Sequence, residues 1–227
     1  MSAPLLKVQG LNAFYERAHI LFDLDLEVGR GEVVALMGSN GAGKSTTLKA
    51  LMGLLDGTQG QVEFDGHDIS RLAPYRRARL GLGFVPEDRR VFSGLTVLQN
   101  LETGRQPPRP GAMHWSPDAL FELFPNLGAM PDRRGDRMSG GEQQMLTVAR
   151  TLMGNPHLLL LDEPSEGVAP LIVEQMAAMI ARLKRAGMAV LLCEQNLHFA
   201  SLVSDRACLL EHGRIVYRGP LDGMPSA

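Results

Sequence analysis

The chain opens with hydrophobic positions that alternate loosely with polar ones between residues 5 and 28. A period of two residues is typical of a half-buried strand, so this stretch predicts antiparallel sheet with one face on the core. The apolar side carries Phe22, Leu24, Leu26 and Val28, and the polar side carries Asp23, Asp25 and Glu27.

The pattern then changes, and short apolar runs begin to alternate with segments of helical spacing. A run over 32–37 predicts a buried strand, and after a glycine-rich turn the spacing of leucines predicts a helix over 45–55. Further along, we predict helices over 141–153 and 171–186 and strands over 158–161 and 189–193. This alternation predicts an α/β protein with a parallel sheet covered by helices.

Two segments do not follow this alternation. Residues 93–137 are rich in proline, and Ser116 with Pro117 forms a favourable cap and first position for a short helix. This segment predicts an inserted, mostly helical lobe. Near the C-terminal end, apolar runs on either side of His212-Gly213 predict a hairpin.

Composition narrows the classes of function. Of the 227 residues 44% are hydrophobic, enough for one large α/β domain with or without a small inserted lobe. The 23 basic residues nearly balance the 25 acidic ones, which argues against nucleic acid as a partner. The apolar runs are far shorter than the roughly 20 residues that cross a bilayer, and the first residues lack a secretion signal. We therefore expect a cytosolic chain, with Cys193 and Cys208 as small buried hydrophobes.

The glycine-rich turn fits the pattern of a phosphate-binding loop, G-x-x-x-x-G-K-[ST]. It consists of Gly38, Ser39, Asn40, Gly41, Ala42, Gly43, Lys44 and Ser45, and Thr46 follows in the helix. Glycines let backbone N–H groups approach phosphate oxygens, and the helix N-terminus adds positive potential. Lys44 can reach the β and γ phosphates and the Ser45 hydroxyl can ligate Mg²⁺. The sequence therefore predicts a site for a nucleoside triphosphate with magnesium.

Two adjacent carboxylates, Asp162 and Glu163, follow the four leucines of a predicted buried strand. Parallel sheets place their ligands at the carboxyl ends of the strands. Asp162 is therefore a candidate magnesium ligand, and Glu163 a candidate general base that polarises the attacking water beside the γ phosphate. The alternative is that the pair only caps the segment at Pro164, which would make little use of four buried leucines.

A second anion-binding helix end is predicted at Ser139, Gly140, Gly141 and Glu142. The serine hydroxyl and the glycine N–H groups at the start of a helix can meet an anion. Taken alone, the run is an ordinary helix cap. Placed after the phosphate loop and 23 residues before Asp162, it resembles the signature of ATP-binding cassette (ABC) transporter ATPases, and the resemblance covers essentially the whole chain.

The resemblance implies an α/β P-loop NTPase fold, the ABC cassette, with an N-terminal antiparallel β-subdomain and an inserted α-helical subdomain. Residues 1–227 would form a single domain, with 1–92 and 150–227 as the nucleotide-binding core plus antiparallel sheet and about 93–149 as the helical subdomain. The resemblance also implies a head-to-tail dimer in which the phosphate loop of one subunit and the Ser139 segment of the other clamp one ATP. Tyr15 would stack on adenine.

Three positions depart from the general ABC pattern. Glu87 stands where most members carry glutamine, and its carboxylate could still ligate magnesium or accept from water. Gln195 stands at the place of the switch histidine, where its amide would contact the γ phosphate as part of the catalytic set with Lys44 and Glu163. His198, three residues later, is the alternative. Ala169 stands where many members have aspartate, so it cannot make that contact across the dimer.

Further runs narrow the resemblance within the family. They are Val85-Pro86-Glu87 with Arg89-Arg90-Val91-Phe92, Glu163-Pro164-Ser165-Glu166-Gly167 with Ala169-Pro170, and Glu194-Gln195-Asn196. These runs are similar to the second ATPase subunit of branched-chain amino acid importers, the LivF type. The resemblance implies ATP hydrolysis, with Mg²⁺, coupled to uptake of branched-chain or related amino acids.

The implied partners are a second ABC ATPase subunit or a second copy of this chain, membrane permease subunits, and a separate periplasmic or extracellular substrate-binding protein. The chain would be cytoplasmic and peripheral on the inner face of the cell membrane through the permeases. The alternatives are an ATPase of urea or short-amide importers, which more often keep glutamine at position 87, and a non-transport ABC ATPase. A phosphate-loop kinase or GTPase that uses Lys44, and a dimerisation module without turnover, also stay open.

Overall fold

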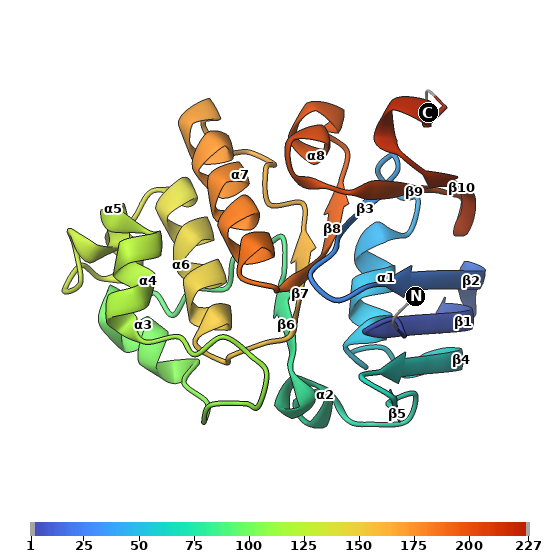
Figure 1. Ribbon diagram of the computed structural model, residues 1–227, viewed down its shortest axis with the longest axis horizontal. Coiled ribbons are helices and arrows are strands. Elements are labelled where there is room, and N and C mark those ends of the chain that lie inside the picture. Colours follow the sequence, from blue (N-terminus) through green and yellow to red (C-terminus); the bar gives the residue numbers. More distant parts are fainter. Residues whose placement is uncertain (1–2, 226–227) are drawn as a thin grey trace.

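The computed structural model describes residues 3–225 and contains two sheets flanked by helices. Figure 1 shows α1 beside the strands of the smaller sheet, with the inserted helices α3, α4 and α5 at the opposite end of the molecule. The strands are β1 (Leu6–Tyr15), β2 (Ala18–Val28), β3 (Val33–Met37), β4 (Gly57–Phe64), β5 (His67–Asp68), β6 (Leu82–Val85), β7 (Leu158–Asp162), β8 (Ala189–Glu194), β9 (Arg206–Glu211) and β10 (Arg214–Gly219).

The helices follow the same chain order. The α-helices are α1 (Lys44–Leu51), α2 (Pro74–Leu80), α3 (Val97–Thr103), α4 (Pro117–Leu123), α5 (Pro125–Gly128), α6 (Gly140–Leu152), α7 (Pro170–Arg185) and α8 (Leu197–Val203), and two 3₁₀ turns span Gly135–Arg137 and Leu221–Gly223. Within residues 3–225, none of these helices is both long and apolar enough to cross a membrane.

The larger sheet has the strand order β10-β9-β3-β8-β7-β6 and is parallel except for the β9–β10 pair. Every residue of β3, β7 and β8 is buried, as expected for central strands covered on both faces. The predicted parallel sheet is therefore confirmed.

The leucines of β7 divide between two cores. Leu158 and Leu160 pack in the cluster that holds α1 and the antiparallel sheet, whereas Leu159 and Leu161 pack in the cluster that holds α6 and α7. Each fully buried leucine stabilises the fold by about 1.5–3 kcal/mol. The strand that delivers Asp162 is thus fixed from both sides.

The smaller sheet, β2-β1-β4-β5, is antiparallel as the alternation predicts. Leu24, Leu26 and Val28 are buried, but Phe22 is only partly buried and Leu21 takes the core position instead. The pairing of β1 with β2 shifts register at this point, and Asp23 has a φ of 52°. The predicted place of Phe22 was therefore wrong, because a bulge reverses the alternation on its N-terminal side.

Helix α1 ends earlier than predicted. The spacing of leucines extends the helix to residue 55, but it stops at Leu51, and Gly53 has a φ of 71°. A left-handed glycine is a common helix terminator. In the inserted segment, the predicted cap at Ser116 is confirmed, since its hydroxyl accepts from Ala119 N at 3.2 Å and Pro117 begins α4.

The predicted hairpin at His212-Gly213 is also confirmed. Both residues have positive φ, 46° and 76°, as a two-residue turn of this kind requires. The space for a side chain at Gly213 is filled by the Ile20 carbonyl, and Phe22 N donates to Gly213 O at 2.9 Å. The hairpin thereby joins the larger sheet to β2.

Candidate functional site

The carboxyl ends of three neighbouring parallel strands, β3, β8 and β7, converge on one edge of the larger sheet. β3 leads into the phosphate loop, β7 ends at Asp162, and β8 ends at Glu194. The register pairs Met37 with Glu194 and Asp162 with Cys193, so these ends lie level with one another. The topology therefore gathers the phosphate loop, the acidic pair and Gln195 at one place.

The phosphate loop turns through three left-handed glycines and opens α1. Gly38, Gly41 and Gly43 have φ values of 157°, 81° and 111°. A side chain at Gly38 would collide with the Leu210 carbonyl. Because glycine has no side chain, the loop backbone can pass this close to β9. Because Gly43 has no side chain to cap α1, the helix N-terminus keeps its capacity for an anion.

Lys44 lies inside this loop with only 3% of its side chain exposed. Its ammonium donates to the carbonyls of Gly38 and Ser39 at 2.8 and 3.0 Å. It also pairs with Glu163 Oε1 at 2.9 Å. The structure thus brings together the two residues for which the sequence predicts the central chemistry. The predicted phosphate would compete with Glu163 for the Lys44 ammonium.

Glu163 is held in a strained conformation with φ of 46°, and its N–H donates to Cys193 O at 3.0 Å. The Gln195 amide donates to Glu163 Oε2 at 3.1 Å and to Asn40 Oδ1 at 2.6 Å, so it links the carboxylate to the phosphate loop. Burial alone would raise the pKa of Glu163, but hydrogen bonds with Glu166, Lys44 and Gln195 lower it overall. A carboxylate is the form in which a general base acts.

Asp162 and Ser45 form the candidate magnesium site. Ser45 Oγ donates to Asp162 Oδ1 at 2.9 Å, and Asp162 is 1% exposed. Burial raises the pKa of Asp162 to about 6, with smaller contributions from the charges of Glu163 and Glu87. A buried carboxylate of this kind, beside a hydroxyl, offers the hard oxygen donors that Mg²⁺ prefers.

The protein groups alone do not complete a metal site. Among residues 3–225, no group of three or more His, Cys, Asp or Glu side chains is arranged to hold a metal ion. Mg²⁺ is commonly held by one or two protein oxygens together with substrate phosphates, so the Ser45–Asp162 pair fits a site completed by ATP. Glu87 is exposed in the loop after β6, where its charge raises the pKa of Asp162.

The second predicted helix end is built differently. Ser139 Oγ accepts from Glu142 N at 3.3 Å, and Glu142 Oε2 accepts from Ser139 N at 2.7 Å, which forms a capping box at the start of α6. Gly140 and Gly141 are the first two residues of the helix. Tyr15 ends β1 and is 42% exposed, which leaves its ring available for stacking.

His198 and Ala169, the two other positions singled out from the sequence, lie in the segments that follow β8 and β7. His198 is exposed in the first turn of α8, and Gln195 rather than His198 contacts Glu163. Ala169 is the N-cap residue of α7 and has no side-chain oxygen to offer.

Two carboxylates of the site were missed by the sequence analysis. Glu194 is 2% exposed and accepts from the N–H groups of Ser165, Gln195 and Asn196 at 3.0, 3.2 and 3.3 Å. It joins the loop after β7 to the loop after β8. The signal for it was an acidic residue at the end of an otherwise apolar strand.

The second missed carboxylate is Glu166. A hydrogen bond to the Glu163 carboxyl, together with the charge of that group, raises the pKa of Glu166 to about 7. The nearby charge of Glu163 therefore favours the protonated form of Glu166, which can donate to the Glu163 carboxylate.

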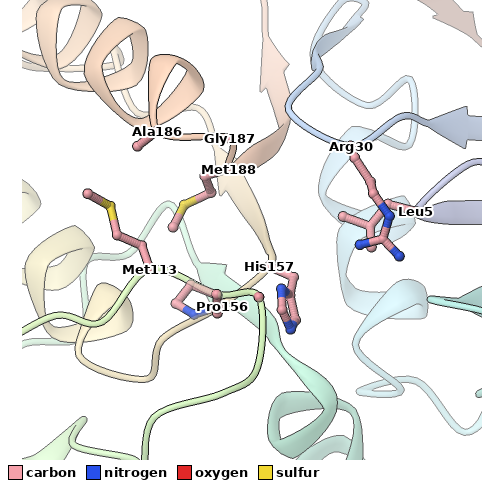
Figure 2. A pocket seen from close by; sticks show the side chains of 10 residues that line it. Leu5, Arg30, Met113, Pro156, His157, Ala186, Gly187 and Met188 are labelled. Atoms are coloured by element: carbon pink, nitrogen blue, oxygen red, sulfur yellow. The ribbon is translucent and has the colours of Figure 1, made fainter.

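A small cavity of about 110 Å³ lies at the opposite edge of the sheet, near the amino ends of β3, β7 and β8 (Figure 2). Arg30, Met113, His157 and Met188 line it, and burial lowers the pKa of His157. Because this edge is remote from the phosphate loop, the cavity takes no part in the site.

Comparison with protein families gives a match over residues 21–166 to the family described as ABC transporter. The chain belongs to this family. The matched segment runs from β2 through the phosphate loop and the α6 start to Glu163, so it includes both predicted helix ends. The cassette is accordingly an ABC-type ATPase that binds and hydrolyses ATP, as the sequence predicted.

Individual relatives support the same assignment. The cassette is 43% identical to the "High-affinity branched-chain amino acid transport ATP-binding protein BraG" of Pseudomonas aeruginosa, over 93% of this chain and 91% of the relative. It is 37% identical to a probable branched-chain amino acid transport ATP-binding protein LivF of Archaeoglobus fulgidus, over 95% and 92%. It is also 35% identical to the lipopolysaccharide export system ATP-binding protein LptB of Haemophilus influenzae, over 95% and 90%.

The fold is shared with a solved structure of a nucleotide-free ATP-binding cassette from an ABC transporter. That chain has a TM-score of 0.81 and 25% identity, with 96% of this chain and 92% of the other covered. The expected cassette fold is therefore confirmed.

Proposed function

We propose that this ABC ATPase drives uptake of branched-chain or related amino acids. The observation that carries the proposal is the 43% identity to BraG over nearly the full length of both chains. The loop from Glu163 to Pro170 and Glu87 in place of glutamine support the same branch. Cargo would be held by a separate binding protein and moved by permease subunits on which this chain sits at the inner face of the membrane.

The chemistry proposed for the site follows from its contacts. Lys44 and the N-terminus of α1 bind the β and γ phosphates, and Tyr15 stacks on the adenine. Ser45 and Asp162, with Glu87 nearby, hold Mg²⁺, which when bound neutralises charge on the phosphates. Once Lys44 contacts phosphate, Glu163 accepts a hydrogen bond from the attacking water. The Gln195 amide, which donates to both Glu163 and Asn40, holds the Glu163 carboxylate in position.

The α6 start, residues 139–142, would complete the site from a second subunit. Ser139 and the N–H groups of Gly140 and Gly141 would meet the γ phosphate bound to the other chain. A head-to-tail pair of this kind, formed with a second copy or with a partner ATPase, encloses two ATP molecules. ATP binding and hydrolysis would then close and open the pair.

A groove of about 650 Å³ is the proposed docking site for the permease. It lies between α2, β6 and α6, and its walls combine apolar side chains such as Tyr75 and Phe92 with arginines such as Arg79 and Arg150. Arg150 Nη1 is buried without a hydrogen-bond partner within the described chain. An amphipathic helix that presents a carboxylate would satisfy both the apolar walls and this guanidinium.

The biochemical test compares wild type with Glu163→Gln. We expect wild type to release phosphate from Mg-ATP, and the variant to lose at least about 100-fold in turnover because a general base contributes a factor of this size. Light scattering should show an ATP-bound dimer in the variant. Wild-type protein that binds ATP without ever releasing phosphate would instead make this chain a non-catalytic half.

The physiological test is uptake by cells that lack this chain. Labelled leucine uptake should fall and return with wild type but not with Glu163→Gln. A defect in urea uptake with normal leucine uptake would assign the chain to the urea branch. A defect in lipopolysaccharide export would assign it to the function named for LptB.

A further inference from the structure

Arg89 occupies an unusual position in the loop after β6, residues 86–92, which we term the Glu87 loop. Arg89 and its neighbour Arg90 both have positive φ, 60° and 43°. Such a conformation costs free energy for residues other than glycine, so neighbouring groups must hold it. The loop therefore has a defined shape rather than an arbitrary one.

Helix α6 supplies the groups that hold this shape. Thr147 Oγ1 donates to Arg89 O, and Arg150 Nη2 donates to Arg90 O at 2.8 Å. At the far end of the loop, the Asn100 side chain accepts from Phe92 N at 2.9 Å and donates to Phe92 O at 3.1 Å. The backbone of Arg89 is thus fixed to the helix that begins with the signature residues.

The side chain of Arg89 crosses to two other segments. Its guanidinium lies so close to Gly140 Cα that a side chain at position 140 would collide with Nη1. Nη2 donates to Gly167 O at 3.5 Å, in the loop that follows Glu163. Arg89, which belongs to the Glu87 loop, therefore contacts both the α6 start and the Glu163 loop, residues 163–169.

Arg90 gives the contrast. Its guanidinium pairs with Asp88 in its own loop at 2.7 Å, and 71% of the side chain is exposed. Two consecutive arginines thus have different environments, since one makes a local surface pair and the other lies between three segments of the site.

We propose that Arg89 is a positioning residue that ties the α6 start to the Glu87 loop and the Glu163 loop, so that these three segments move as one unit when the two subunits close on ATP. The proposal rests on the head-to-tail clamp described above. Arg89 acts through Gly140 and Gly167 and does not itself contact the nucleotide. Its loss would leave each phosphate loop able to bind ATP but would let the α6 start adopt other positions, which weakens ATP-driven pairing.

The test uses the full chain carrying Glu163→Gln, in which ATP-bound dimers accumulate. Arg89→Ala, Arg89→Lys and the control Arg90→Ala are compared by light scattering against ATP concentration, and ATP binding to dilute monomer is measured separately. We expect Arg89→Ala to raise the ATP concentration for half-dimerisation about tenfold, the scale of one lost charge-assisted hydrogen bond, with monomer binding and melting temperature unchanged. Arg89→Lys should restore part of the loss, and Arg90→Ala should have no effect.

Each other result has a defined meaning. An Arg89→Ala protein that dimerises like its parent, or that loses monomer binding and thermal stability to the same degree as dimerisation, would overturn the positioning role. A Glu163→Gln parent that stays monomeric at saturating ATP would overturn the clamp itself, and the role of Arg89 with it.

Discussion

The two helix N-termini proposed to bind ATP, at the starts of α1 and α6, differ in burial and in capping. The start of α1 is buried, has glycine at the cap position and carries the ammonium of Lys44. The start of α6 is more exposed and already satisfied by its capping box, with the Glu142 carboxylate in the first turn. The first end is built to bind an anion strongly, whereas the second offers a weaker interaction that a partner can form and release.

The first prediction tests the anion site at the start of α1. Lys44→Ala should weaken ATP binding to the monomer about 10- to 150-fold, because charge-assisted hydrogen bonds to phosphate are lost. Fluorescence titration with a labelled ATP analogue measures this change. Lys49→Ala, on the same helix, is the matched control and should bind normally. Equal weakening in both variants would contradict a specific role for Lys44.

The second prediction concerns the loss of stability caused by the buried Asp162 carboxylate, which contacts Ser45 at the start of α1. The pKa of Asp162 is raised from 3.8 to about 6, so the folded chain retains a proton that the unfolded chain loses between about pH 4 and 6. Stability therefore decreases as the pH rises through this window. Asp162→Asn removes the buried carboxylate and should stabilise the nucleotide-free protein by about 1–3 kcal/mol at pH 7.5, and by less at pH 5.

Urea unfolding at the two pH values, without nucleotide or magnesium, measures this difference. Mg²⁺-dependent turnover should be lost in the same variant. A stabilisation that is the same at both pH values would show that the carboxylate is not held at a raised pKa.

The third prediction tests the weaker phosphate contact proposed for the start of α6. Ser139→Ala should raise the ATP concentration needed for dimerisation about tenfold in the Glu163→Gln background, with monomer binding unchanged. Ser116→Ala is the matched control, because it removes an equivalent cap from α4 in the same part of the molecule. If both variants dimerise equally poorly, the effect is one of helix stability and not of phosphate contact.

The fourth prediction has the smallest effect. Glu142→Gln keeps the reciprocal hydrogen bond of the capping box but removes a negative charge from the α6 start. Dimerisation should then need about two- to fivefold less ATP, since a charge near a helix terminus is worth about 0.3–1 kcal/mol. Asp118→Asn, in the first turn of α4, should leave the midpoint unchanged. A higher midpoint for Glu142→Gln would argue that this carboxylate aids pairing.

Much of this arrangement follows from the sequence because it depends on local signals. The phosphate loop, the leucines before Asp162 and the cap at Ser139 each have a spacing that reflects a single element. The fold was predicted for the same reason, since alternation between strand and helix periods specifies the parallel sheet.

What could not be predicted depends on tertiary contacts. The bulge at Asp23 moved Phe22 from the core face, and no local signal marked it. Glu194 and Glu166 became visible as site residues only when the loops after β7 and β8 came together. The role proposed for Arg89 likewise needs three segments that are distant in the chain.

The division of β7 between two cores also restricts where the chain can change its length. Inserting one residue before Leu161 would either exchange the faces of the preceding leucines or displace Asp162 by about 3.3 Å, which separates it from Ser45. The connection over 104–116 contains no helix or strand. Although Asn155 and the buried Trp115 anchor it, residues 110–114 are mostly exposed and lie outside any sheet register. Length variation among homologous cassettes should therefore concentrate in that connection and be absent from β7.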